Sequence, residues 1–398
     1  MALYSTQEAA ERAGVDTDYV GRLIDGGLLG SAARDLLSAG DVRRILFLKS
    51  LDDAGLPLEG VAAAMASGAI SLDFMDAPAY ERYAALSSET FAQVSERTGI
   101  PFELLAVIRE SIGLEEPSPD DRLSDNELAI VPFIELQVVH GFRTKSIERL
   151  LRVGGEATRR IAESEAAWWY AEVMFPNVES GEAPEDPGFA KFANQSTPLA
   201  ERSVLAMYHL QQARAWTANM INGFEATLEN AGLHSRLERP PAICFLDITG
   251  YTRLTQERGD DAAADLAAKL ARLVERSSVR HGGKPIKWLG DGVMFHFRDP
   301  AQGVRAALEM VAGMAPAELP PAHVGLHTGP VIFQGGDYFG QTVNISARIA
   351  EYARPGEVLV SQAVADASRD QGIAFQDIGP VELKGVGSTT HVLRAHLA

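Results

Sequence analysis

From Pro240 onward the chain alternates short apolar stretches with helical segments, and this alternation limits the folds that it can adopt. Apolar runs typical of strands cover 242–246, 285–289, 293–297, 324–327 and 331–333, and helical patterns cover 260–280, 300–314 and 342–352. Strand, helix, two strands, helix and strand in succession is the order of a ferredoxin-like α/β layer. We therefore predict an α+β domain over 240–398, completed by a strand over 357–360 and a hairpin around 384–387.

Two aspartates stand where these predicted strands end. Asp247 follows the first strand, and Asp291 lies in the turn between the next two. In a ferredoxin-like layer the first strand lies beside that hairpin, so both carboxylates can meet at one end of the sheet. Carboxylates without Cys or His ligands nearby suit Mg²⁺ or Mn²⁺, which prefer oxygen ligands. Either aspartate alone is equally typical of a turn or a helix cap, so the metal site depends on the whole pattern.

The segment after Asp247 joins the first strand to the predicted helix and contains a glycine. Backbone N–H groups of such a turn bind phosphates well. The turn therefore predicts phosphate contacts, although many strand-to-helix turns look alike. Its residues are Ile248, Thr249, Gly250, Tyr251 and Thr252.

Lys287 and Asp337 together have the chemistry that distinguishes adenine from guanine. Adenine offers a donor at its exocyclic amine and an acceptor at the adjacent ring nitrogen, which suit Asp337 and Lys287 respectively. Guanine reverses both groups, and each unmade buried bond costs about 1–3 kcal/mol. Composition alone favours the alternative, in which Lys287 is a solvated strand residue and Asp337 a loop residue.

Asn344 and Arg348 are four residues apart, so on a helix they share one face. An amide can orient a ribose, and a guanidinium can stabilise charge that develops on a phosphorus centre. Two such residues in isolation are also common on an ordinary surface helix.

This combination resembles the catalytic domain of class III adenylyl cyclases over about residues 240–398. The resemblance implies conversion of ATP to cyclic AMP and pyrophosphate with two Mg²⁺ or Mn²⁺ ions per site. It assigns Asp247, Ile248 and Asp291 to the metals, Lys287 and Asp337 to adenine, and Asn344 and Arg348 to the transition state. In this family the site lies between two catalytic domains, one of which supplies the metal aspartates, so the resemblance implies a homodimer.

One position departs from the pattern of the family. Some relatives have a phosphate-binding lysine two residues beyond Lys384, where this chain has Val386. Lys384 itself, or the backbone of the 248–252 turn together with the metals, is then expected to bind the triphosphate.

The N-terminal part reads as helices separated by glycine and proline breaks. Residues 1–75 resemble the winged-helix segment of MerR-type regulators, and 76–232 resemble the helical regulatory half of soluble bacterial class III cyclases. A long amphipathic helix over 198–230 leads through a 233–239 linker into the catalytic domain. We predict an all-α regulatory region in which this helix transmits a signal, although a helix packed on its own domain fits equally well.

Bulk properties restrict the partners. The chain has 398 residues, a net charge of −18 and one cysteine, Cys244, in an apolar run. It shows neither a signal peptide nor an apolar stretch of membrane-spanning length, which predicts a cytoplasmic protein. The negative charge disfavours nucleic acid, and residues 1–60 hold ten acidic against six basic residues, the wrong balance for phosphate contacts.

Two alternatives to an adenylyl cyclase follow from the same residues. A guanylyl cyclase would keep the fold, but Lys287 and Asp337 match the other base. A DNA-binding regulator with a nucleotide-sensing domain would use the 1–75 segment. The regulatory input stays open among a small molecule, a lipid and a proton: Trp168, Trp169, Tyr170 and Phe175 suit an apolar pocket, and nine histidines allow a pH response.

Overall fold

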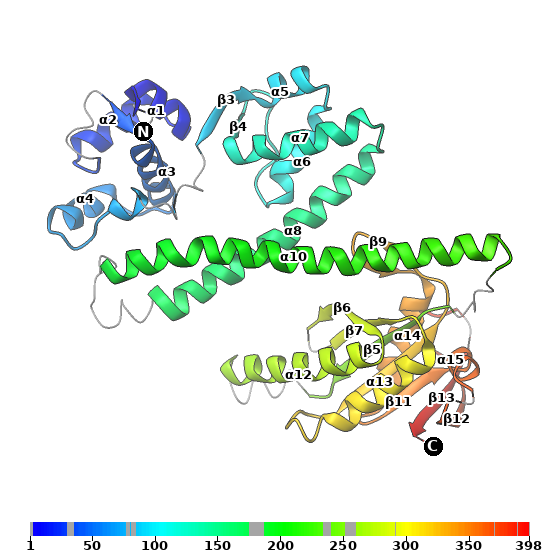
Figure 1. Ribbon diagram of the computed structural model, residues 1–398. Helices are drawn as coiled ribbons and strands as arrows, with labels where there is room; N and C mark the ends of the chain where they lie inside the picture. The colour runs from blue at the N-terminus through cyan, green and yellow to red at the C-terminus, as the bar shows by residue number, and fades with distance from the viewer. Residues whose placement is uncertain are drawn as a thin grey trace. The chain divides into compact units, whose positions relative to one another are not determined.

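The computed structural model describes residues 3–29, 36–76, 80, 85–174, 187–233, 240–250, 260–290, 292–369, 371–387 and 389–397. The chain divides into two compact units, Met1–Asn222 (unit 1) and Gly223–Ala398 (unit 2). Their elements are labelled in Figure 1.

The first part of unit 1 is a cluster of short helices. Its elements are β1 (Leu3–Tyr4), α1 (Thr6–Ala13), α2 (Thr17–Asp25), β2 (Leu37–Ser38), α3 (Ala39–Asp53), α4 (Leu58–Ala66) and the 3₁₀ helix η2 (Asp73–Asp76). Ser5 and Ser38 begin α1 and α3 through capping boxes with Glu8 and Asp41. Gly14 ends α1 at a φ of 67°, which glycine adopts without strain. Apolar faces of these helices close one core, which includes Val20, Leu23, Leu37, Ile45 and Leu48.

The second part of unit 1 has a core of its own. Its elements are β3 (Leu86–Thr90), α5 (Phe91–Thr98), α6 (Phe102–Ser111), β4 (Arg122–Ser124), α7 (Asp125–Val139), α8 (Thr144–Trp169) and the π-helix η4 (Tyr170–Met174). A buried ion pair joins α6 to α7, with Arg109 Nε 2.9 Å from Glu127 Oε1. Burial raises the pKa of Glu127, but hydrogen bonds from Arg109 and Ser124 outweigh it and hold that pKa below its usual value.

Unit 1 is mainly helical, as predicted, but it also contains two short antiparallel sheets. β1 pairs with β2, and β3 pairs with β4. Each pairing joins segments that lie more than thirty residues apart in the chain. Two- to five-residue strands of this kind carry too little alternation for sequence to predict them.

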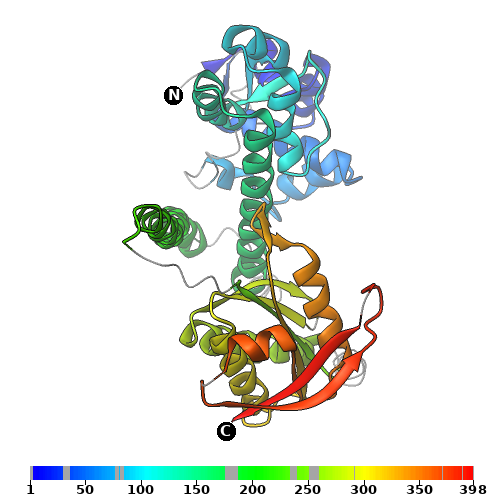
Figure 2. The same cartoon turned by 90° about the vertical axis from the view of Figure 1, so that its right-hand side faces the viewer.

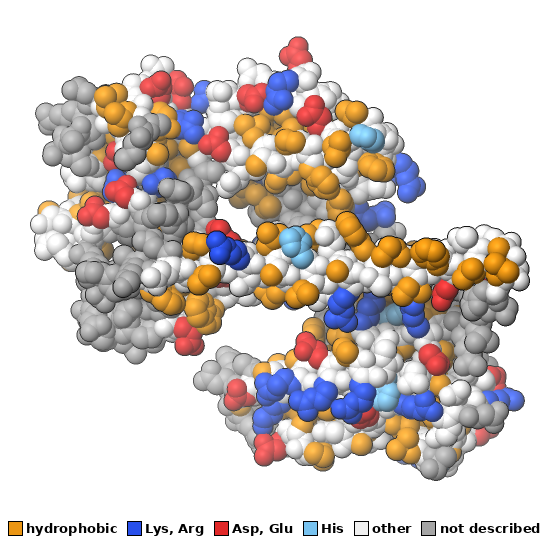
Figure 3. All heavy atoms as spheres, viewed as in Figure 1, with side chains coloured by type: hydrophobic (Ala, Val, Ile, Leu, Met, Phe, Trp, Pro, Cys, Tyr) orange, Lys and Arg blue, Asp and Glu red, His pale blue; other side chains and the backbone are white. Residues whose placement is uncertain are grey.

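Helix α10 (Pro187–Asn230) is a single 44-residue helix that contains the predicted 198–230 helix. Its predicted apolar face is exposed, with Trp216 61% and Phe224 70% accessible. Figure 3 shows apolar side chains along the length of this helix. Over the part of the chain that the structure describes, no helix combines the length and the hydropathy of a membrane span.

Unit 2 is built on one seven-stranded sheet. Its strands are β5 (Ala242–Ile248), β6 (Gly283–Leu289), β7 (Gly292–Phe297), β8 (Ala322–Thr328), β11 (Val358–Ser361), β12 (Ile373–Val381) and β13 (Thr390–Leu397). They lie in the order β12-β13-β11-β8-β5-β7-β6. All neighbours are antiparallel except β11 and β8. Figure 2 shows the long β12–β13 hairpin, in red, at one edge of the sheet.

The helices of unit 2 cover both faces of this sheet. α12 (Asp260–Arg280) and α13 (Pro300–Gly313) pack with Leu246, Phe295 and Leu326 in the larger core. α14 (Gln341–Tyr352) packs on the opposite face against β5 and β8. The short α15 (Gln362–Ala367) follows β11. The predicted mixture of helices and sheet over 240–398 is therefore confirmed, with elements in the predicted order.

Two features of unit 2 differ from the sequence prediction. The predicted strand over 331–333 is β9 (Ile332–Gln334), and it pairs only with β10 (Asp337–Phe339) in a separate two-stranded sheet. Residues 384–387 lie between β12 and β13, which pair with one another as the predicted hairpin. These two strands have nine and eight residues, and the sequence pattern around the turn did not indicate that length.

Gly325 sets the distance between α14 and the sheet. A Cβ at this position would lie 2.1 Å from the backbone nitrogen of Ala350. We predict that Gly325→Ala pushes α14 away and lowers the free energy of unfolding by about 1–3 kcal/mol, because packed backbones cannot yield that space cheaply. Thermal unfolding measures the change.

Gly387→Ala is the matched control, because a Cβ there meets no heavy atom within 4 Å. Its melting temperature should stay near that of the wild type. If Gly325→Ala melts with the control, then α14 is not held by this close approach.

Candidate active site

Asp247 lies at the end of β5, on the sheet face that bears α14. Alternation along β5 sends Cys244 and Leu246 into the core with α12 and α13, and Asp247 to the other side. Its carboxylate is 45% exposed, and Oδ2 lies 3.5 Å from Nε2 of His323, its partner across the β5–β8 pair.

Gly292 faces Asp247 in the β5–β7 pair. A Cβ on Gly292 would lie 3.2 Å from Asp247 Oδ1 and 3.2 Å from the Leu246 carbonyl oxygen. A side chain at this position would be in tight contact with both oxygens, and the strand or the carboxylate would have to move by a few tenths of an ångström. Asp291, which precedes Gly292 in the sequence, lies outside the described residues, as do Tyr251 and Thr252.

At the start of the predicted phosphate turn, the polar groups of Thr249 already have hydrogen-bond partners within the protein. The Thr249 N–H donates to the Pro321 carbonyl over 2.9 Å, and Thr249 Oγ1 lies 3.4 Å from His323 Nδ1. Ile248 is buried, and Gly250 has a φ of 78°. A phosphate at this turn must therefore be met by N–H groups beyond Thr249.

Lys287 and Asp337, which were predicted to act on one base, lie together in the structure and form a direct ion pair. Lys287 Nζ lies 2.5 Å from Asp337 Oδ2, and the side chains are 36% and 25% exposed. Lys287 belongs to β6 and Asp337 to β10, fifty residues later, so the fold rather than the local sequence brings them together. The pair presents an ammonium donor and a carboxylate acceptor side by side.

Asn344 and Arg348 lie one turn apart on α14. Asn344 is exposed. The Arg348 guanidinium pairs with Glu351 on the same helix, and this hydrogen bond raises the pKa of Arg348 above its usual value. Any anion that binds Arg348 would have to compete with Glu351 for the guanidinium.

The departure at Val386 has a structural reason. Val386 packs with Ile345 and Leu383 in a small core beneath α14. Lys384, two residues earlier, is exposed in the turn and has a free path to solvent. Where the resemblance led us to expect a phosphate-binding lysine, the structure thus has a packing residue, with an exposed lysine two positions earlier.

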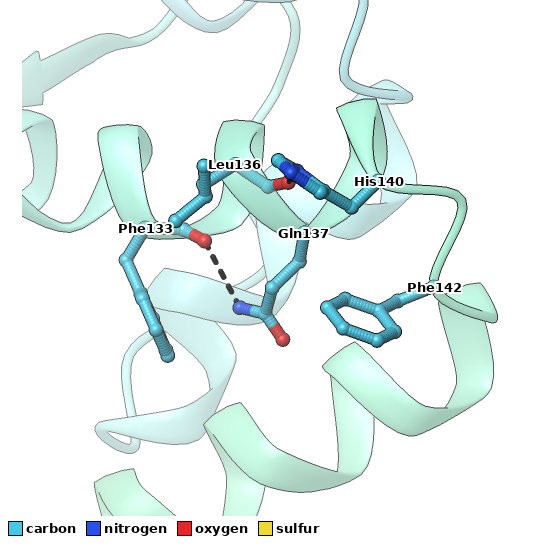
Figure 4. A pocket seen from close by; sticks show the side chains of 5 residues that line it. All are labelled: Phe133, Leu136, Gln137, His140 and Phe142. Atoms are coloured by element: carbon cyan, nitrogen blue, oxygen red, sulfur yellow. Dashed lines mark hydrogen bonds between the residues drawn. The ribbon is translucent and has the colours of Figure 1, made fainter.

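The aromatic cluster predicted as an apolar pocket is largely exposed. Trp168 and Tyr170 are 52% and 59% accessible, Trp169 stacks on Phe192, and Phe175 lies outside the described residues. A shallow apolar pocket of about 310 Å³ lies elsewhere in unit 1, at the end of α7 and the turn that follows it (Figure 4). Its lining residues are Phe133, Leu136, Gln137, His140 and Phe142.

Sequence reasoning missed His323 and the aromatic residues beside Asp337. His323 contacts Asp247 only because β8 lies next to β5 in a particular register. Tyr338 stacks on His296 of β7 with 4.5 Å between ring centroids. No spacing in the chain connects these residues, so only the sheet pairing could reveal them. Over the described part of the chain, no three His, Cys, Asp or Glu side chains gather as a metal site.

Residues 238–395 match the family model of the adenylate and guanylate cyclase catalytic domain. Unit 2 carries a cyclase catalytic domain. The match spans all of the sheet except the last two residues of β13, the helices α12 to α15 and every described candidate residue of the site. Which residues bind metal, base and phosphate stays a prediction.

Similar proteins extend the comparison beyond the cyclase domain. An uncharacterized protein of Mycobacterium tuberculosis is 27% identical over 316 residues, 77% of this chain and 79% of the relative. The pH-sensitive adenylate cyclase of the same species is 26% identical over 313 residues, 76% of each chain. The solved adenylyl cyclase CyaB from P. aeruginosa aligns with a TM-score of 0.36 and 23% identity, over 40% of this chain and 95% of that one.

Both mycobacterial alignments are longer than the cyclase domain, so they reach into unit 1. The domain match and the relatives named adenylate cyclase confirm the predicted enzyme class. The MerR-like segment over 1–75 stays a prediction.

We predict that Gly292→Ala lowers cyclase activity by roughly 10-fold, because the added methyl group shifts the Asp247 carboxylate by a few tenths of an ångström and a shift of about 1 Å can cost about 100-fold. The activity and the Mn²⁺ concentration for half-maximal rate should both change, while the melting temperature stays close to that of Gly387→Ala. A folded variant with the wild-type rate and metal requirement would contradict this role for Gly292.

Proposed function

We propose that the chain converts ATP to 3′,5′-cyclic AMP and pyrophosphate as a homodimer with shared active sites. The Lys287–Asp337 pair carries this proposal, because it supplies a matched donor and acceptor within a cyclase domain. The pH-sensitive relative and a Streptomyces relative, both named adenylate cyclase, support the same reaction.

The proposed reading of the base follows from hydrogen-bond direction. Asp337 accepts from the exocyclic amine of adenine, and Lys287 donates to the neighbouring ring nitrogen. With guanine both contacts face a group of the wrong kind, at about 1–3 kcal/mol per unmade bond. A guanylyl cyclase is therefore the weaker candidate.

Asp247 and Asp291, with the backbone oxygen of Ile248, are the proposed ligands of two Mg²⁺ or Mn²⁺ ions. The described part of the donor set fits, because the Asp247 carboxylate, beside His323, is 45% exposed and offers the hard oxygen ligands that suit these ions. When bound, two such ions activate a hydroxyl nucleophile and offset the charge of a leaving pyrophosphate.

The remaining residues act on the ribose and the phosphates. The 3′-oxygen of ATP attacks its α-phosphorus, the bond to the β-phosphate oxygen breaks, and the hydroxyl proton leaves to solvent. Asn344 orients the ribose, and Arg348 stabilises the charge on the α-phosphate once it leaves Glu351. Lys384 and the turn from Gly250 to Thr252 bind the outer phosphates.

We propose that the metal residues of one chain work with the other residues of a second chain. The class III resemblance implies this division. The structure is consistent with it, because Lys287 and Asp337 pair within one chain.

Unit 1 is the proposed regulator, and α10 is its proposed transmitter. α10 ends at Asn230, a short distance in sequence before β5 begins at Ala242. The relative whose name reports pH sensitivity aligns into unit 1, which supports a regulatory role there. A site shared between chains is sensitive to small shifts of its halves.

The shared site predicts complementation between inactive variants. Asp247→Ala and Lys287→Ala should each lose nearly all cyclic AMP formation from ATP. An equimolar mixture should recover activity, because one of the two sites in a mixed dimer takes intact Asp247 and intact Lys287 from different chains. Cyclic AMP is measured after mixing and subunit exchange, with each single variant as the control. An inactive mixture in which mixed dimers are demonstrated would falsify the shared site.

The base assignment predicts a change in nucleotide preference. Lys287→Glu combined with Asp337→Cys should weaken ATP use and favour GTP relative to the wild type, because donor and acceptor are exchanged. The kcat/KM ratio for ATP over GTP should fall by at least about fivefold, the equivalent of one mismatched contact. An unchanged ratio in the folded double variant means that these residues do not read the base.

A further inference from the structure

We propose that Tyr338 of β10, whose ring stacks on His296 of β7, positions the Asp337 carboxylate and thereby sets the preference for adenine. This inference rests on the proposed function, because it concerns the residue that we assign to the base. Tyr338 and His296 are positioning residues and act on the nucleotide only through Asp337.

The hairpin that carries Asp337 lacks support from the main sheet. β9 and β10 have three residues each, and among the described strands they pair with one another and with no other. Isolated two-stranded hairpins are marginally stable in water. The position of Asp337, the first residue of β10, therefore depends on side chains that tie the hairpin to the rest of unit 2.

Tyr338, in the middle of β10, attaches the hairpin to the main sheet. Strand alternation points its ring away from the direction of Asp337 and Phe339, and it is 9% exposed while Phe339 is 49% exposed. It packs with Ile243 of β5 and Met294 of β7 in one small core. This core joins the hairpin to two central strands of the sheet.

Three further side chains hold the Tyr338 ring. The His296 ring lies parallel to it, with 4.5 Å between centroids and 17° between planes. Phe333 packs on it from β9 at 4.9 Å, and Lys284 Nζ lies 5.4 Å from both the Phe333 and the Tyr338 centroids. Stacking on the imidazole and contact with the ammonium restrict the orientation of the Tyr338 ring as well as its position in the core.

His296 is a neutral partner in this stack. Burial, with help from the positive charges of Lys284 and Arg298, lowers the pKa of His296 to about 4. The imidazole is therefore uncharged at neutral pH and does not repel the Lys284 ammonium nearby.

Tyr338 also bonds directly to Asp337. Its backbone N–H donates to Asp337 Oδ1 over 2.8 Å, which leaves Oδ2 for Lys287. The stacked ring holds the backbone of Tyr338 in place, and the Tyr338 N–H holds Oδ1 of Asp337. Oδ2 of Asp337 then lies beside the Lys287 ammonium. A shift of Tyr338 thus turns the carboxylate that accepts from the adenine amine.

Four full-length variants and a control test this chain of contacts. Tyr338→Ala and His296→Ala remove the stack, whereas Tyr338→Phe and His296→Phe keep a flat ring in each place. Val364→Ala trims a fully buried residue of α15 outside this core and controls for lost stability. The readouts are the kcat/KM ratio for ATP over GTP and the Kd values for 3′-deoxy-ATP and 3′-deoxy-GTP, which lack the attacking hydroxyl and bind without reacting.

Tyr338→Ala and His296→Ala should lower both the kinetic ratio and the binding ratio by at least about fivefold, the equivalent of one misplaced hydrogen bond. The two phenylalanine variants and Val364→Ala should keep the wild-type ratios. Added to Asp337→Ala, Tyr338→Ala should cause no further loss of preference, because both changes remove the same contact.

Wild-type ratios in folded Tyr338→Ala, when Asp337→Ala alone lowers them, would overturn the positioning role and leave the proposed function intact. Unchanged ratios in Asp337→Ala would instead overturn the base assignment, and the positioning role with it. A wild-type protein that forms no cyclic AMP contradicts the proposed reaction, while the deoxynucleotide Kd values still decide whether the stack controls base preference.

Discussion

The alternation of side chains along β5 is the constraint on which the rest of unit 2 depends. Leu246 and Ile248 point into the core with α12 and α13, so Asp247 between them must point to the opposite face. That face is the one on which α14 and the β9–β10 hairpin pack. A shift of one residue in the register of β5 would bury Asp247 in the apolar core and expose its neighbours, so the fold and the candidate site are fixed together.

The charge of the protein is divided unequally between its units. Unit 1 has 34 acidic and 19 basic residues, whereas unit 2 has 20 acidic and 17 basic residues. The cyclase domain is thus close to neutral, and exposed arginines such as Arg272 and Arg276 lie along α12 (Figure 3). A polyanionic nucleotide that approaches unit 2 meets little net repulsion from that unit, although the whole chain is strongly negative.

The sequence was most informative where local pattern decides structure. Apolar runs bounded by Gly or Pro predicted strands such as β5 and β7, and helical periodicity predicted helices such as α12 and α14. The candidate site residues could be located in the sequence because they stand at the ends of these strands or on these helices. Contacts that depend on register escaped prediction. His323 meets Asp247 across a strand pair, Tyr338 meets His296 from a separate hairpin, and the Thr249 N–H is already bound to Pro321. These contacts join distant segments, and nothing in the local sequence encodes them.

The ion pair between Lys287 and Asp337 has a consequence for substrate affinity. Without a nucleotide the two charges satisfy one another, so neither is left unpaired in a half-buried position. Under the proposed assignment, adenine has to replace a charged partner of each residue with a neutral one. The net gain on binding is then smaller than the new hydrogen bonds alone would give, and a base that offers only one matching group gains almost nothing. Under this assignment the ion pair competes with the base for the same two side chains. It lowers the affinity for any base and increases the difference in affinity between adenine and guanine.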